Sequence, residues 1–193
     1  MKRHASGKLS AFEVAINKGD ARLLKDLPVK LTLEDAVTGL FALWQYLDCP
    51  DFRELHWIYT WWDHDFDRKS TAAKLNLKLK ALNKRIERLE KLYRLSGCLL
   101  RLKDAINGLF TLWGRLNCNS LKRLHWVHTW WDKDFSREET ALKLKIDIEI
   151  LHKRIERLEA DYKSSEPNLP RGACIPDNIR DIEKESTDEN EEI

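Results

Sequence analysis

Apolar residues recur along the chain at the three- and four-residue spacing that places them on one side of a helix. Between residues 79 and 93, for example, an apolar stripe alternates with lysine, arginine and glutamate. The pattern predicts two sets of four helices joined by short turns. Their expected positions are 32–49, a second helix beginning at Asp51, 67–75 and 79–93, then 102–116, 121–133, 137–144 and 148–162.

The two sets of helices are copies of one pattern. The stretches 55–90 and 124–159 align without a gap, each residue lying 69 positions after its counterpart, and roughly half of the positions aligned across the whole repeat are identical. Self-similarity of this kind determines the architecture before any single motif does. We therefore expect two units, 31–95 and 96–163, which are small enough to need packing on each other or on a partner chain.

The segments outside the repeat are expected to be simpler. The capping-box pattern at 10–13 predicts a short helix that ends at Gly19, and a second short helix is expected at 21–27, so residues 1–30 form an N-terminal brace. The segment 164–193 has three prolines, no apolar period and an acidic end. This composition predicts a disordered acidic tail.

Composition and charge agree with an all-α protein that binds a polyanion. Glycine (7) and proline (5) are scarce, as in helical proteins. The formal net charge of +2 divides unevenly, with +7 on residues 1–162 and −5 on residues 163–193. A basic body with an acidic appendage is typical of polyanion-binding domains, although simple solubility gives the same signs.

The four cysteines, Cys49, Cys98, Cys118 and Cys174, form no C-x-x-C pair and are expected to be free thiols in a reducing cytoplasm. The N-terminal stretch has no apolar segment typical of a signal peptide, and no stretch approaches the ~20 apolar residues that span a bilayer. We expect a cytoplasmic protein, associated with the nucleoid if its source is bacterial, and no membrane partner.

Residues 67–93 have the arrangement of a helix-turn-helix: a short helix, a turn at 76–78 and a longer basic helix. Ala72 and Ala73 supply the small inward-facing residues, and Asn76 tolerates a left-handed turn. The expected anchors of the second helix are Leu79, Leu82, Ile86 and Leu89. The expected DNA contacts are Lys78, Lys80, Ala81, Asn83, Lys84, Arg85 and Arg88, where cations neutralise phosphates and Lys80 and Asn83 address bases.

The second copy differs at the tip of its long helix. Lys78, Lys80, Ala81 and Asn83 of the first copy correspond to Asp147, Glu149, Ile150 and His152. Carboxylates repel phosphates, so repeat one is expected to read DNA and repeat two to pack against it or to bind DNA weakly. The basic residues that persist in repeat two are also candidate DNA contacts: Lys153, Arg154 and Arg157.

The helix-turn-helix resembles the N-terminal DNA-binding segment of LysR-type transcriptional regulators, whose pattern runs A-A-x-x-L, a few residues, then A-L-S-x-x-I-x-x-L-E. The matching residues are Thr71, Ala72, Leu75, Leu77, Ala81, Leu82, Asn83, Ile86, Leu89 and Glu90. The resemblance implies that Lys80, Ala81, Asn83 and Lys84 enter the major groove. It covers about 35 residues per repeat, with no effector-binding domain, and sigma-factor region four and other three-helix DNA readers have nearly the same pattern.

The tryptophan, histidine and acidic motifs of the chain give weaker indications of function. The repeated T-W-W-D motif, 60–63 and 129–132, could stack on bases, but tryptophan at helical spacing favours core or inter-repeat packing. The histidines lack the spacing of a metal site, and the acidic stretch 63–67 is followed by Arg68 where a calcium loop needs glycine. The sequence contains no phosphate loop or nucleophile motif, so we expect neither an enzyme nor a cofactor.

The sequence therefore predicts a tandem helix-turn-helix regulator of transcription whose partner is double-stranded DNA. The alternative is a helical protein-interaction module or adaptor, such as an anti-regulator or a polymerase-binding protein. A homodimer or another regulatory protein is a further expected partner, and the sequence shows no domain for a small-molecule effector.

Overall fold

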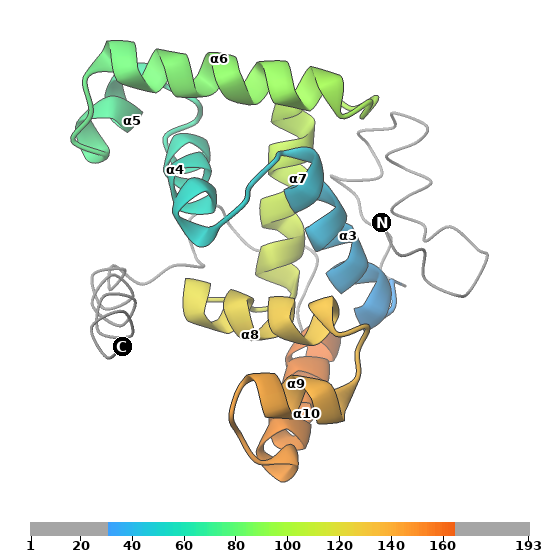
Figure 1. Ribbon diagram of the computed structural model, residues 1–193. Helices are drawn as coiled ribbons and strands as arrows, with labels where there is room; N and C mark the ends of the chain where they lie inside the picture. Colours follow the sequence, from blue (N-terminus) through green and yellow to red (C-terminus); the bar gives the residue numbers. More distant parts are fainter. Residues whose placement is uncertain (1–30, 165–193) are drawn as a thin grey trace.

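The computed structural model describes residues 31–164, which form eight α-helices and no strand (Figure 1). The helices are α3 (Leu33–Tyr46), α4 (Phe52–Asp63), α5 (Arg68–Lys74), α6 (Leu79–Leu95), α7 (Leu102–Arg115), α8 (Leu121–Asp132), α9 (Arg137–Lys143) and α10 (Ile148–Ser164). The predicted all-α class is confirmed. The short N-terminal helices and the acidic tail that the sequence predicts lie outside the described residues.

The helices begin where local sequence predicts them. The Thr32 side chain accepts from the backbone N–H of Asp35, whose carboxylate accepts from Thr32 in return, which completes a capping box at α3. Asp51 caps α4 through the N–H of Glu54. These side chains satisfy N–H groups that the first turn of a helix leaves without partners.

The repeat extends to the backbone of the turns. Asp48 and Asn117, at equivalent positions after α3 and α7, both have a φ of 50°. Phe66 and its counterpart Phe135 share a φ of 63°, which is uncommon for a large side chain. The Phe66 ring packs edge-on against Trp61, with 5.1 Å between ring centroids. This packing accompanies the left-handed conformation in both copies.

The first two helices of each repeat build one shared core. Helix α3 packs most extensively against α7, and each of these two helices also packs on the other repeat's second helix, α3 on α8 and α7 on α4. Gly39 and Gly108 are buried at equivalent positions of the central pair. Figure 1 shows the consequence: α5 and α6 lie at one end of this core, and α9 and α10 lie at the other.

An aromatic seam joins the two repeats by equivalent contacts in both directions. Phe41 stacks on Trp131 with a centroid distance of 5.0 Å, and Phe110 stacks on Trp62 at 4.8 Å. The Trp62 indole N–H also donates to Asn107 Oδ1 at 2.8 Å. The predicted packing of tryptophans between the repeats is confirmed for Trp62 and Trp131, and the exchange of equivalent partners gives the chain approximate two-fold symmetry.

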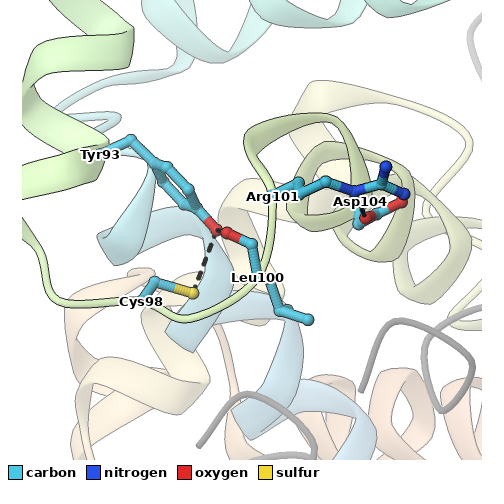
Figure 2. A network of polar contacts seen from close by, with 5 residues as sticks. All are labelled: Tyr93, Cys98, Leu100, Arg101 and Asp104. Atoms are coloured by element: carbon cyan, nitrogen blue, oxygen red, sulfur yellow. Dashed lines mark hydrogen bonds and ion pairs between the residues drawn. The ribbon is translucent and has the colours of Figure 1, made fainter. Parts of the chain in front are cut away.

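The junction between the repeats is held by a small polar network (Figure 2). The Tyr93 hydroxyl donates to the carbonyl of Leu100 at 2.6 Å and lies 3.1 Å from Cys98 Sγ. Burial is the main cause that raises the pKa of Tyr93, so the phenol stays protonated. Beside it, Arg101 Nε pairs with the buried carboxylate of Asp104 at 2.8 Å.

Candidate nucleic-acid interface

Helices α5 and α6 with the turn between them form a helix-turn-helix hairpin, residues 68–95, which we call the α5–α6 hairpin. Asp67 caps α5 by accepting from the N–H groups of Lys69 and Ser70. The Ser70 hydroxyl also donates to the Asp67 carboxylate, and this hydrogen bond is the main cause that lowers the pKa of Asp67. In the turn Asn76 has a φ of 52°, as the sequence predicts, and the N–H of Leu77 donates to the Ala72 carbonyl at 2.8 Å.

The inner face of the hairpin is apolar. Leu82, Ile86 and Leu89 are buried, which confirms them as anchors of α6. Ala72 is buried where α5 meets α6, and α5 also packs on α4. This packing fixes the direction in which the outer face of α6 points.

The sequence predicts that Ala73 and Leu79 face inward, and both predictions are wrong. Ala73 is exposed, because it follows the buried Ala72 by one residue and a helix turns about 100° per residue. Leu79 is 40% exposed. It is the first residue of α6, so no preceding turn of the helix lies against its side chain.

The outer face of α6 is a row of exposed cations. The expected contact residues that are exposed are Lys78, Lys80, Ala81, Lys84, Arg85 and Arg88. Within residues 31–164 none of these five cations forms an ion pair. Their charges are therefore available to an external anion.

Asn83 is placed differently from its neighbours. It is half-buried, and its Oδ1 accepts a hydrogen bond from Arg68 Nη1 at 3.2 Å. A bidentate contact with adenine uses both ends of the amide, and Asn83 Oδ1 has a second lone pair that can accept from the base while Arg68 stays bound. Sequence reasoning missed Arg68, because only the fold brings the start of α5 against α6.

The two hairpins of the chain differ strongly in charge. The α5–α6 hairpin has ten basic and two acidic side chains. The equivalent hairpin of α9 and α10, residues 137–164, has seven of each, and we call it the α9–α10 hairpin. Of the two hairpins, α5–α6 therefore carries the larger positive charge.

The α9–α10 hairpin keeps exposed cations along its long helix, at Lys153, Arg154 and Arg157. Its tip is acidic, because Asp147 and Glu149 are both exposed there. The Asp147 carboxylate also accepts a hydrogen bond from the Glu149 N–H at 2.8 Å. The DNA contacts predicted in repeat two therefore lie on a helix whose first turn is negatively charged.

Two histidines of repeat two, His125 and His128, lie at the seam between the repeats. His128 lies 5.1 Å from the Phe41 ring, and His125 lies at the same centroid distance from Phe52. Burial is the main cause that lowers the pKa of both imidazoles. In residues 31–164, no three histidine, cysteine or acidic side chains gather as a metal site would require.

No helix within the described part of the chain combines the length and apolar character needed to cross a membrane. Comparison of the chain with protein-family models, with curated proteins and with solved structures gives no match.

Proposed function

We propose that the chain is a DNA-binding regulator of transcription that places α6 of repeat one in the major groove. The observation that carries this proposal is the row of exposed cations, without ion pairs to other residues of 31–164, on the outer face of a helix held by a helix-turn-helix hairpin. The resemblance of this hairpin to LysR-type regulators supports the same function. On this proposal the protein works in the cytoplasm, at the nucleoid if the source is bacterial.

The cations divide by their position on α6. Lys78 stands at the N-cap, where the helix end adds partial positive charge for a phosphate. Lys84, Arg85 and Arg88 extend along the helix and neutralise phosphates on the groove edges. Lys80, in the first turn, is the side chain that reaches a guanine edge.

Small side chains let the backbone of the hairpin approach the duplex. Ala81 is exposed in the first turn of α6, and Ala73 is exposed on α5. A methyl group at Ala81 can contact a thymine methyl without holding the helix away from the bases. The position of Ala73, unexpected from the sequence, thus suits a surface that lies against DNA.

The test is a fluorescence-anisotropy titration of the whole chain against random-sequence duplex DNA at low and near-physiological salt. Wild-type affinity is expected to fall steeply with salt, because bound cations release counterions from the duplex. Changing Lys80→Glu together with Lys84→Glu is expected to lower affinity by about 100-fold or more, and circular dichroism should show unchanged helicity.

The matched control is Lys153→Glu with Arg154→Glu, which makes the same kind of charge change on α10. It is expected to lower affinity far less, because the first turn of α10 is already acidic. If wild type does not bind at low salt, or if both double variants lose binding equally, the assignment of DNA to α6 is wrong.

A second candidate function is a helical protein-interaction module. The α9–α10 hairpin favours it, because large apolar side chains and carboxylates occupy its tip where repeat one has alanine and lysine. For such a module we expect a defined protein partner, together with DNA binding that is absent or does not depend on salt.

A further inference from the structure

Repeat two exposes two large apolar side chains where repeat one has alanine. Leu142 on α9 is 81% exposed and Ile150 on α10 is 48% exposed. Their counterparts, 69 positions earlier, are Ala73 and Ala81. The difference between the repeats therefore adds apolar surface to both helices of the α9–α10 hairpin.

Both side chains face away from the core of the chain. Leu142 follows the buried Ala141, and Ile150 precedes the fully buried Leu151. Helix α9 packs on α10, so the two side chains belong to one hairpin whose inner face is already covered. Exposed leucine or isoleucine alone is common on protein surfaces, so the charges around the pair decide what covers it.

Charge along α10 is ordered so that the helix complements a second copy of itself. Its start is acidic, with Asp147 and Glu149, and its exposed middle is basic, with Lys153 and Arg154. An antiparallel crossing near Ile150 brings that residue against its own copy. It also places the acidic start of each helix opposite the basic middle of the other, as an isologous interface requires.

The α5–α6 hairpin, at the other end of the core, does not have self-complementary charge. The α5–α6 hairpin, with ten basic and two acidic side chains, repels its own copy, whereas the balanced α9–α10 hairpin does not. Of the two equivalent hairpins, only α9–α10 combines exposed large apolar residues with self-complementary charge.

We infer that two copies of the chain pair through their α9–α10 hairpins around a two-fold axis near Ile150. The pairing does not rest on the proposed function, but its consequence does. Because α6 lies at the opposite end of the core from α10, the dimer presents two basic hairpins at its far ends (Figure 1). Such a dimer holds two separate DNA segments.

The test is sedimentation velocity of the whole chain over a wide range of concentrations without DNA. A monomer–dimer equilibrium is expected. Leu142→Ala with Ile150→Ala restores the residues of repeat one and is expected to raise the dimer dissociation constant about tenfold or more. The matched control, Leu95→Ala with Leu99→Ala, removes two leucines that are 74% and 67% exposed elsewhere, and should leave it unchanged.

A charge exchange tests the orientation of the two helices. Glu149→Lys alone is expected to weaken the dimer, and the same change combined with Lys153→Glu should restore it, since positions 149 and 153 then exchange their charges and can attract each other across the axis again. A restoring double variant cannot be explained by loss of folding. Failure of the second change to restore pairing would overturn the antiparallel arrangement.

The inference is wrong if the chain is monomeric at every concentration, which would leave the hairpin to another protein or to another segment of the chain. It is also wrong if the control pair of leucines matters as much as Leu142 and Ile150. Because the experiment omits DNA, its failure is distinct from failure of the proposed function: a monomer can still bind DNA, and a dimer can lack DNA binding.

Discussion

The hydroxyl of Tyr162 donates a hydrogen bond of 2.7 Å to the backbone carbonyl of Leu31, 131 residues earlier in the chain. Tyr93 makes the equivalent bond to Leu100 at 2.6 Å. The last helix of each repeat is therefore tied to the segment just before the first helix of the other, once across a short linker and once across the whole described chain. The two hydrogen bonds therefore connect the repeats at both of their junctions.

Removing the long-range bond should loosen this connection. Tyr162→Phe leaves the ring in place but deprives the Leu31 carbonyl of its donor, and about 1 kcal/mol of stability should be lost. Thermal unfolding followed by circular dichroism should show a midpoint lower by about 2–4 °C for a chain of this size. Tyr93→Phe is the matched variant at the other junction. An unchanged midpoint for Tyr162→Phe would mean that water replaces the phenol without cost.

The aromatic seam should contribute equally from both repeats. Phe41→Ala and Phe110→Ala each remove a buried ring from equivalent stacks, on Trp131 and Trp62, and each should cost about 3–5 kcal/mol. Urea unfolding measures both. Phe41→Leu and Phe110→Leu keep most of the apolar volume and serve if the alanine variants do not fold. Markedly unequal losses would show that the two-fold symmetry of the contacts does not extend to their energies.

Stability should fall at mildly acidic pH because of the histidines in the seam. Burial lowers the pKa of His128 from 6.5, so the unfolded chain binds the proton first. The stability that neutral His128 provides is present above 6.5 and is lost as the pH falls from there through its lower folded value. Around the imidazole, Asp132 raises its pKa, while His125 and Lys143 lower it.

The measurement compares the urea midpoints at about pH 7.5 and about pH 5.5. His128→Tyr introduces the residue that repeat one has at position 59 and should reduce the drop in midpoint. Part of the drop should remain, because burial also lowers the pKa of His125. An equal drop in wild type and variant would assign the pH dependence to other groups.

Local features of the fold could be predicted from the sequence, and contacts between distant segments could not. Asp51 begins α4 as expected, because a helix cap depends on neighbouring residues alone. The apolar period placed Leu82 correctly but failed at Leu79, because the period gives the side of a helix on which a residue lies and not what covers the first turn.

The small size of the repeated units predicted that they pack on each other or on a partner chain, but not which helices of the two repeats contact each other. Nothing in the spacing says that Phe41 stacks on Trp131 instead of Trp62, since both tryptophans occupy the same position of the repeat. The site shows the same limit. Exposure of the α6 cations follows from a helical wheel, whereas the bond between Arg68 and Asn83 depends on the angle at which two helices meet.

If the charge at the tip of the long helix decides DNA binding, exchanging it between the repeats should exchange the activity. Lys78→Asp with Lys80→Glu gives α6 the acidic tip of α10 and should lower affinity for random duplex DNA by about 100-fold or more. Asp147→Asn with Glu149→Lys should make α10 a DNA-binding helix. Asparagine removes the charge of Asp147, but its side-chain oxygen can still accept a hydrogen bond from the backbone N–H of residue 149 at the start of α10.

The measurement is fluorescence anisotropy over a series of salt concentrations. The α10 variant should bind with a steeper dependence of log affinity on log salt than wild type, because each added phosphate contact increases the slope by about one. Adding the α6 substitutions to the α10 variant should leave substantial affinity, now carried by repeat two. If that combined variant does not bind, the two hairpins differ in more than charge, and the scaffold of repeat two does not present α10 to a groove.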